Sequence, residues 1–246
     1  MLGRIEILPD PQTLARHVAE WMTQAALTAN RPFRVSLSGG STPKALYSLL
    51  ASNDFRDRFP WQRVFWYWGD ERFVPYDHPD SNYRMTREAM LSKAPVPPEN
   101  IHPVPADGTP EEAARRYERT LRDAYGAATF DPARPLFDIT LLGLGPDGHT
   151  ASLLPGEPVL EERTRWVAAV SHGRPEVRIT MTYPAIESSR RVAFLVAGQE
   201  KAAILRTIFS RGADVPAARV RPVGELFWFV DRAAAGEDGR AGAQPT

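Results

Sequence analysis

The chain contains no cysteine. This absence excludes disulfides, zinc–thiolate sites, iron–sulfur clusters and a thiol nucleophile. No stretch approaches the roughly 20 apolar residues that a membrane-spanning helix needs, so no membrane partner is expected. Thirty Lys and Arg residues balance thirty Asp and Glu residues, so the basic excess typical of nucleic-acid-binding proteins is missing. Lysine is scarce: only Lys44, Lys93 and Lys201 occur, and the other basic residues are arginines.

The length of 246 residues allows one large domain or two small ones. Hydrophobic residues make up 43% of the chain and charged residues 24%, a composition typical of globular proteins. We find no internal repeat and no clear linker, and we predict a single domain over residues 1–232. The last stretch, 233–246, is small and polar and is predicted to be a disordered tail. The N-terminus lacks the pattern of a secretory signal, so a cytoplasmic location is expected.

Several short segments are apolar at nearly every position instead of alternating with polar residues. This pattern is typical of parallel strands that are covered by helices on both faces. The predicted strands are Arg4–Leu8, Phe33–Ser38, Val64–Trp68, Phe137–Leu144, Val192–Ala197 and Leu226–Val230.

Helix start signals lie between these runs. Pro11 opens one predicted helix, and Thr42-Pro43 and Thr109-Pro110 combine a capping residue with proline at the first helical position. Further helices are predicted to begin at Tyr183-Pro184 and Gln199. Strands that alternate with helices predict an α/β fold, here one domain with a doubly wound, mostly parallel sheet and helices on both faces.

Polar segments follow four of the predicted strands: SGGSTPK, GDER, GPDGHTAS and GQEK. In an open α/β sheet, ligands bind outside the carboxyl ends of the strands. We therefore expect these four segments to converge on one site.

The segment Ser38–Pro43 contains Gly39, Gly40, Ser41 and Thr42. The glycines allow close backbone approach, the hydroxyls donate hydrogen bonds, and the start of the following helix favours an anion. The alternative is a tight strand-to-helix turn without a ligand. The segment is not a Walker P-loop, which has its lysine immediately before Ser or Thr.

The segment Gly143–His149 matches G-x-G-x-x-G, so a dinucleotide site must be considered. The candidate helix after it meets Pro155 within two turns, and no acidic residue for a ribose follows the next strand-like segment, Trp166–Val170. We interpret the segment as a loop that presents Asp147 and His149. Among five histidines, His149 is our candidate general base, since histidine has an unperturbed pKa of about 6.5.

Asp70-Glu71-Arg72 follows another predicted strand. Either this is a surface ion pair of little energetic value, or a carboxylate such as Asp70 orients water or sugar while Arg72 binds phosphate or a developing oxyanion. Arg178 and Lys201 are further candidates for phosphate binding; surface solvation is the alternative for both.

Together these segments resemble the 6-phosphogluconolactonase family, within the glucosamine-6-phosphate isomerase/deaminase-like superfamily. The resemblance covers about residues 4–230. The matching blocks are SLSGGSTPKALY (36–47), WGDERFVPYDHPDSNYRM (68–85), DITLLGLGPDGHTASLLPG (138–156), RITMTYPAI (178–186) and VAGQEKA (196–202).

The resemblance implies a deaminase-like, modified Rossmann-type fold and hydrolysis of 6-phospho-D-glucono-1,5-lactone in the oxidative pentose phosphate pathway. It implies no metal and no cofactor, and His149 as the base that activates water. Around the substrate it places Gly39, Gly40, Ser41, Arg72, Arg178 and Lys201. We expect a small-molecule sugar-phosphate lactone as the partner, no nucleic acid, and a monomer or weak dimer.

Three alternatives stay open. The superfamily's deaminases carry an aromatic residue where Arg72 stands and a glutamate five residues after the histidine, where this chain has Leu154. A non-catalytic sugar-phosphate sensor would need a fused DNA-binding segment, for which we expect no room before the first strand at about Arg4. A dehydrogenase is disfavoured by the features of the glycine loop described above.

Overall fold

The structure, a computed structural model, describes residues 3–171, 176–210 and 213–236. Its strands are β1 (Arg4–Leu8), β2 (Phe33–Leu37), β3 (Val64–Trp68), β4 (Asp70–Arg72), β5 (Ile101–His102), β6 (Ile139–Leu142), β7 (Val167–Val170), β8 (Arg178–Met181), β9 (Arg191–Val196) and β10 (Glu225–Asp231). Its α-helices are α1 (Pro11–Thr28), α2 (Ser41–Leu50), α3 (Asn82–Thr86), α4 (Pro110–Tyr125), α5 (Tyr183–Glu187), α6 (Ala202–Phe209), α7 (Pro216–Arg219) and α8 (Arg232–Ala235). Short 3-10 turns cover Trp61–Arg63, Pro98–Asn100, Pro158–Glu161 and Gln199–Lys201, and a π-helical turn covers Arg87–Leu91.

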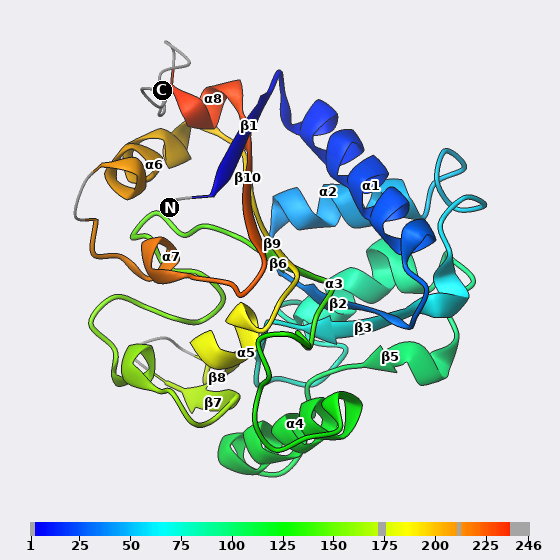
Figure 1. Cartoon of the computed structure of the whole chain (residues 1–246), viewed down its shortest axis with the longest axis vertical. Helices are drawn as coiled ribbons and strands as arrows, with labels where there is room; N and C mark the ends of the chain where they lie inside the picture. Colours follow the sequence, from blue (N-terminus) through cyan, green and yellow to red (C-terminus); the bar gives the residue numbers. More distant parts are fainter. Residues whose placement is uncertain (1–2, 172–175, 211–212, 237–246) are drawn as a thin grey trace.

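A parallel sheet of seven strands runs through the molecule in the order β1-β10-β9-β6-β2-β3-β5 (Figure 1). All six predicted strands belong to it, with ends that differ from the prediction by no more than two residues. Burial is nearly complete along the inner strands, as expected when both faces are covered. The prediction of a mostly parallel sheet is confirmed.

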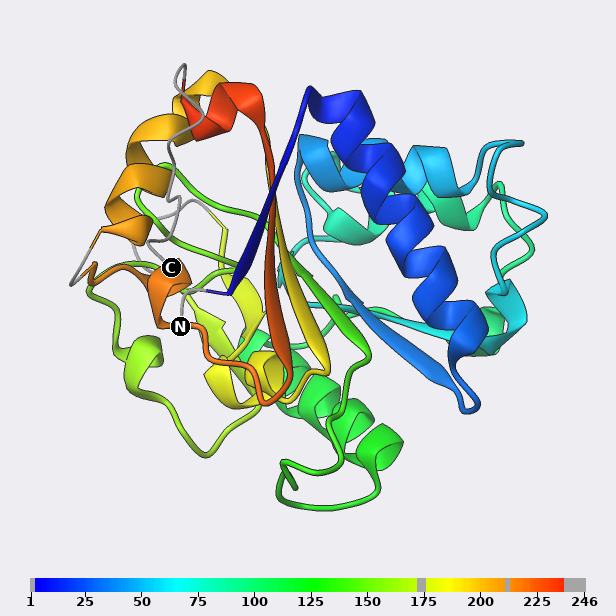
Figure 2. The ribbon, with the colours of Figure 1, turned by 45° about the horizontal axis from the view of Figure 1, so that its top comes forward.

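Helices cover both faces of this sheet. In Figures 1 and 2, α1 and α2 lie on one side of the β1-β10-β9 part and α6 lies on the other. The doubly wound arrangement is therefore confirmed.

Two of the predicted helices begin with a side-chain cap: Asp10, just before the predicted start at Pro11, accepts the backbone N–H of Thr13 at 2.7 Å, and Thr109 forms a reciprocal capping box with Glu112. The prediction of Thr42 as a capping residue is wrong, because α2 begins at Ser41 after Gly40, which makes no side-chain cap.

A second, antiparallel sheet with strand order β4-β8-β7 was not predicted. The prediction treated Asp70–Arg72 as a loop after a strand, whereas these residues form β4 and pair with β8. The segment is short and polar, and its pairing partner lies more than a hundred residues away in the sequence. Local pattern therefore gave no signal for this strand.

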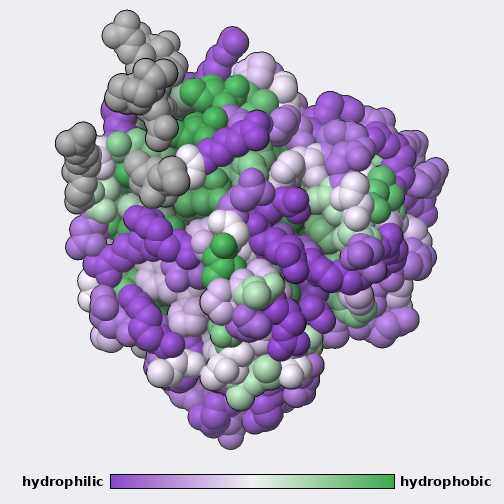
Figure 3. All heavy atoms as spheres, in the orientation of Figure 1, coloured by the Kyte–Doolittle hydropathy of each residue, from purple (hydrophilic) through white to green (hydrophobic). Residues whose placement is uncertain are grey.

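One continuous apolar core connects the elements, and four tryptophans, Trp61, Trp66, Trp68 and Trp228, are almost completely buried in it. Hydrophilic residues cover most of the face shown in Figure 3. No helix among the described residues is long and apolar enough to cross a membrane.

The predicted boundary between domain and tail at residue 232 is wrong. Arg232–Ala235 form α8, and Ala234 and Ala235 are buried. The Asp231 side chain caps this helix by accepting the backbone N–H of Ala234 at 2.7 Å. Alanine favours helix and packs in small spaces, so a run of small residues is no evidence of disorder. Residues 237–246 of the predicted tail lie outside the described residues.

Candidate active site

The carboxyl ends of β2 and β6 meet where the connections of the chain diverge. From β2 the chain proceeds to β3 and β5 on one side, and from β6 it proceeds to β9 and β10 on the other. Ligands of open α/β sheets bind at such switch points. A cavity of about 190 Å³ lies there, lined by Ser38, Gly39, Gly40, Asp70, Arg72, Asn82, Gly143, Leu144, Gly145, His149, Thr150, Ala151 and Arg178.

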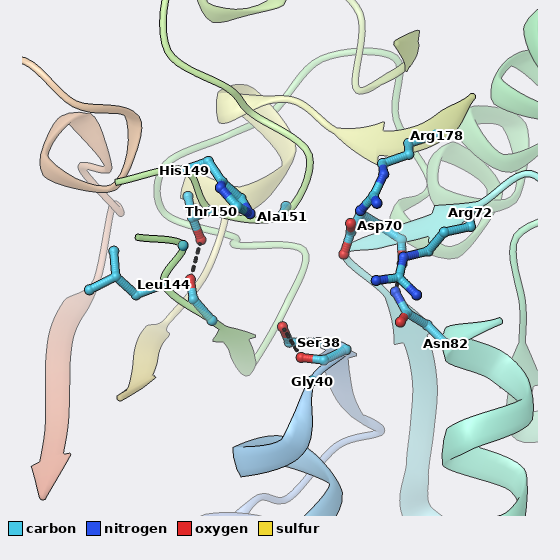
Figure 4. Close-up of a pocket in the computed structure, with 13 residues that line it drawn as sticks. Ser38, Gly40, Asp70, Arg72, Asn82, Leu144, His149, Thr150, Ala151 and Arg178 are labelled. Carbon is cyan, nitrogen blue, oxygen red and sulfur yellow. Dashed lines mark hydrogen bonds between the residues drawn. The ribbon is translucent and has the colours of Figure 1, made fainter. Parts of the chain in front are cut away.

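The cavity has two facing walls (Figure 4). The loop after β6 carries His149 and Thr150 on one side. On the other side, β4, β8 and the start of α3 bring together Asp70, Arg72, Arg178 and Asn82. Ser38 and Gly40 lie between the walls, just before α2. We call these parts the histidine wall (residues 143–151), the arginine wall (Asp70, Arg72, Asn82, Arg178) and the floor (residues 38–40).

A buried tyrosine fixes the floor. The Tyr47 hydroxyl, on α2, accepts the Ser38 backbone N–H at 2.9 Å and donates to the Ser38 carbonyl at 2.8 Å. The side chain is fully buried, and this burial raises the pKa of Tyr47, so the phenol stays protonated and can donate. The Tyr47 hydroxyl therefore fixes both backbone polar groups of Ser38, the first residue of the connection between β2 and α2.

Close backbone approach explains Gly39. A β-carbon at this position would lie 2.1 Å from Oδ1 of Asn82, so no larger residue fits while Asn82 keeps its place. Asn82 in turn donates through Nδ2 to the Asp70 carbonyl at 3.0 Å. The floor thus packs directly against the arginine wall.

Asp147 orients His149. Its Oδ1 lies 2.5 Å from His149 Nδ1 and also accepts the His149 backbone N–H at 3.1 Å. Burial raises the pKa of Asp147, but the hydrogen bonds from the His149 ring and backbone outweigh it, so the pKa is lowered overall and the carboxylate form is favoured. A carboxylate at Nδ1 requires the proton on that nitrogen, which leaves Nε2 of a neutral ring as a proton acceptor.

The His149 ring packs against the backbone of Gly145 in the same loop. A β-carbon on Gly145 would come within 2.0 Å of His149 Nδ1, so glycine is required for this packing. The Thr150 hydroxyl donates to the Gly143 carbonyl at 2.9 Å and closes the loop from the other side. Ala151 has a φ of 49°, a strained value for a residue other than glycine, and it too lines the cavity.

Two arginines stand directly opposite one another on the arginine wall, since Arg72 of β4 pairs with Arg178 of β8. Like charges at facing positions of neighbouring strands repel each other. Nε of Arg72 is buried and has no hydrogen-bond partner within the described part of the chain. An anion in the cavity would relieve the repulsion and satisfy such donors.

Asp70 is a buried carboxylate on the same wall, 6% exposed. Its Oδ2 accepts the Ser152 hydroxyl at 2.7 Å, and the Ser152 backbone N–H in turn donates to the Thr180 hydroxyl at 3.2 Å. These hydrogen bonds connect the end of the histidine-wall loop to β4 and β8.

The structure brings together most of the predicted site residues. Those that line the cavity are Gly39, Gly40, Asp70, Arg72, His149 and Arg178. Asp147 contacts His149 but does not line the cavity, and neither do Ser41 and Thr42 in the first turn of α2. Lys201 ends the turn after β9 and is likewise not a lining residue.

Sequence reasoning did not single out Asn82, Thr150 or Ala151. Asn82 follows the N-cap Ser81, and the hydroxyl of Ser81 accepts the Arg84 backbone N–H at 3.1 Å. The D-S-N sequence could have indicated a helix start, but nothing local indicates that this start abuts the glycine floor. Thr150 and Ala151 stood inside the matching block 138–156 without an assigned role.

The dinucleotide interpretation of Gly143–Gly148 is not supported. The segment forms a turn in which the Gly148 N–H donates to the Gly145 carbonyl at 3.0 Å, and no helix begins directly after it. A pyrophosphate would need the N-terminus of such a helix. Among the described residues, no group of three or more His, Asp or Glu side chains is arranged to hold a metal ion.

Comparisons with known proteins show which proteins this chain resembles over nearly its whole length. The chain is 41% identical over 245 residues to the 6-phosphogluconolactonase of Nostoc sp., with 96% of this chain and 99% of that protein covered. It is 37% identical to the human 6-phosphogluconolactonase, with 95% and 93% covered. The solved structure of 6-phosphogluconolactonase from Thermotoga maritima is 31% identical and superposes with a TM-score of 0.79, covering 93% of this chain and 99% of that one.

The sequence also matches the family described as glucosamine-6-phosphate isomerases/6-phosphogluconolactonase over residues 9–228. A monomeric glucosamine-6-phosphate deaminase has a similar structure, with a TM-score of 0.78, but at 22% identity this likeness concerns the fold alone. The chain belongs to the glucosamine-6-phosphate isomerase/6-phosphogluconolactonase family.

Proposed function

We propose that this protein hydrolyses 6-phospho-D-glucono-1,5-lactone to 6-phospho-D-gluconate, the lactone-opening step of the oxidative pentose phosphate pathway, with His149 as the general base. The observation that carries the proposal is the opposition of the two walls. A histidine oriented by a carboxylate faces a cross-strand pair of arginines over one small cavity. The relatives named above are lactonases of this specificity.

Nε2 of His149 takes a proton from a water molecule as the water oxygen attacks the lactone carbonyl carbon. The resulting tetrahedral intermediate collapses by breaking the bond between that carbon and the ring oxygen. The imidazolium then returns the proton to the ring oxygen, which becomes the free hydroxyl of the product. Asp147 stabilises the imidazolium through Nδ1. A lactone is an activated ester, so no covalent nucleophile is required.

The arginine wall and the floor bind the substrate. Arg72 and Arg178 pair with the phosphate, and the backbone N–H groups at the start of α2 face the same anion. Asp70, held by Ser152, orients a sugar hydroxyl or the attacking water. Ser41, Thr42 and Lys201 stay predicted contacts of the substrate, although they do not line the cavity. No metal or other cofactor enters this scheme. The oligomeric state, a monomer or weak dimer, stays a prediction, and so does the cytoplasmic location.

A deaminase or isomerase reaction has less support. The position predicted to distinguish the two activities is Leu154, which does not line the cavity, and Asp70 is the one carboxylate among the described lining residues. The glutamate that the deaminases carry five residues after the histidine therefore has no counterpart among the described lining residues.

A coupled assay tests the proposal. Glucose 6-phosphate and its dehydrogenase generate the lactone in place, and its disappearance is followed with and without the protein, against the spontaneous rate. We expect acceleration that the His149→Gln variant loses. Ammonia release from glucosamine 6-phosphate would instead support the deaminase alternative. Binding of 6-phosphogluconate without any acceleration would indicate a sensor.

A further inference from the structure

A third charged side chain of β4 takes no part in the proposed reaction. Asp70 and Arg72 line the cavity, whereas Glu71, between them, points to the opposite face of the strand and is 3% exposed. A fully buried carboxylate needs hydrogen-bond donors around it, because burial of an unpaired charge is strongly unfavourable.

Both oxygens of Glu71 are surrounded by donors. Oε1 accepts the backbone N–H groups of Arg72 at 2.8 Å and Asn82 at 2.7 Å. Oε2 accepts the backbone N–H of Tyr83 at 2.7 Å and the Ser81 hydroxyl at 3.1 Å. One donor belongs to β4 and the other three belong to the start of α3, so this carboxylate joins the strand to the helix.

The residues joined in this way are those that face the substrate cavity. Arg72 donates through Nη1 to the Asp80 carbonyl at 2.5 Å, immediately before the start of α3. Asn82 donates to the Asp70 carbonyl and packs against Gly39. Displacement of α3 relative to β4 would therefore move two lining residues, Arg72 and Asn82, together.

We propose that Glu71 is a positioning residue for substrate binding: it fixes α3 against β4 and so sets where Arg72 and Asn82 meet the phosphate of the substrate. The proposal rests on the function proposed above. His149 stands on the opposite wall and makes none of these contacts, so loss of Glu71 affects binding much more than the proton transfer.

The test compares the kinetics of Glu71→Gln with those of the wild type, using the lactone generated in place. The amide keeps one acceptor oxygen and turns the other into a donor, which faces the Tyr83 N–H. We expect KM to rise by about tenfold, the equivalent of one charge-assisted hydrogen bond, and kcat to fall by much less. A merely structural role would lower the folded fraction and hence the apparent kcat, without moving KM.

Glu162→Gln is the matched control. The Glu162 carboxylate also accepts two backbone N–H groups and a hydroxyl, those of Thr164 and Arg165, but it does not line the cavity. We expect its KM to equal that of the wild type. Should Glu71→Gln not fold, Ser81→Ala serves in its place. It removes one of the four donors around the Glu71 carboxylate, which we call the four-donor cage of Glu71, and should raise KM by a smaller factor.

A wild-type KM in Glu71→Gln, or an equal rise in Glu162→Gln, would overturn the proposal. The failure of the proposed function is distinguishable, because the wild type would then show no acceleration at all. In that case calorimetric titration with 6-phosphogluconate still decides the role of Glu71: weaker binding to the variant supports it, and equal binding contradicts it.

Discussion

The two walls of the cavity are built by different means. The histidine wall is a loop whose key side chain is oriented by one carboxylate two residues away, Asp147, and whose packing depends on Gly145. The arginine wall is a paired strand tied to a helix start by the four-donor cage of Glu71. The first is local in sequence; the second joins segments about a hundred residues apart.

This difference suggests a division of labour. The base needs its ring held in one orientation and tautomer, and contacts within a single loop are enough for that. Two like charges at facing positions of neighbouring strands disfavour each other, so the elements that carry them need a rigid support. We therefore expect changes on the histidine wall to lower kcat and changes on the arginine wall to raise KM.

The largest effect is expected on the histidine wall. His149→Gln removes the base but keeps a side chain of similar size, so kcat should fall by about 10²- to 10⁴-fold while KM changes little. Steady-state kinetics of the coupled assay measure both constants. His17→Gln, on α1 and away from the cavity, is the control and should behave as the wild type. A retained kcat in His149→Gln would rule out the assigned base.

The second effect concerns the pH dependence of the free energy of unfolding, to which Glu71 behind the arginine wall contributes. Burial raises the pKa of Glu71 to about 7, against the hydrogen bonds from Asn82, Tyr83 and Arg72, which lower it. The folded state therefore holds this proton more tightly than the unfolded state. The stabilisation is complete below the ordinary pKa of 4.5 and is lost as pH rises through about 7. The loss amounts to about 3 kcal/mol at roughly 1.36 kcal/mol per pKa unit.

Urea unfolding of the wild type and Glu71→Gln at pH 5 and pH 8 measures this effect. The free energy of unfolding of the wild type, relative to that of the variant, should be lower at pH 8 than at pH 5. Glu162 provides the opposite case, since its backbone hydrogen bonds lower its pKa. Its contribution is complete above its ordinary pKa and is lost as pH falls. A pH-independent difference between wild type and Glu71→Gln would contradict the assignment.

The third effect is on binding. Arg178→Met removes one member of the cross-strand pair, and KM should rise by about 10- to 100-fold, the range for a hydrogen bond to a charged group. The kcat should change far less. Arg191→Met, at the start of β9 and away from the cavity, is the matched control. If Arg178→Met lowered kcat as strongly as it raised KM, the division between the walls would be wrong.

The smallest effect concerns the orientation of the base. Asp147→Asn keeps the shape of the side chain but removes the charge that stabilises the imidazolium, and its amide can present a donor instead of an acceptor to Nδ1, so the tautomer is no longer fixed. We expect kcat to fall by about tenfold, with KM unchanged. Asp80→Asn, an exposed carboxylate near the arginine wall, serves as the control. An unchanged kcat in Asp147→Asn would show that His149 needs no orienting partner.

The sequence predicted six of the seven strands of the main sheet, because each is a mostly apolar run, and it predicted five helices from local start signals. It did not predict the two-residue strand β5 or the short helices α3, α7 and α8. It also predicted His149 and Asp147 together, since both stand in one loop. By contrast, the antiparallel sheet depends on the pairing of Arg72 with Arg178, which no local pattern encodes.

Side-chain direction explains the remaining differences. Position after a strand indicates the edge of the sheet but not the face that a side chain presents, so Ser41, Thr42 and Lys201 were predicted at the cavity and do not line it. Asn82 was missed for the opposite reason: it follows no strand of the main sheet and reaches the cavity only because Gly39 leaves space for it.

The most direct test of the division between the walls compares two substrates, the 6-phosphorylated lactone and D-glucono-1,5-lactone, which lacks the phosphate. Values of kcat/KM are measured for the wild type, His149→Gln and Arg178→Met. We predict that His149→Gln lowers kcat/KM by the same factor for both lactones, whereas Arg178→Met lowers it only for the phosphorylated one. An equal loss for both lactones in Arg178→Met, or no loss in His149→Gln, would contradict the account.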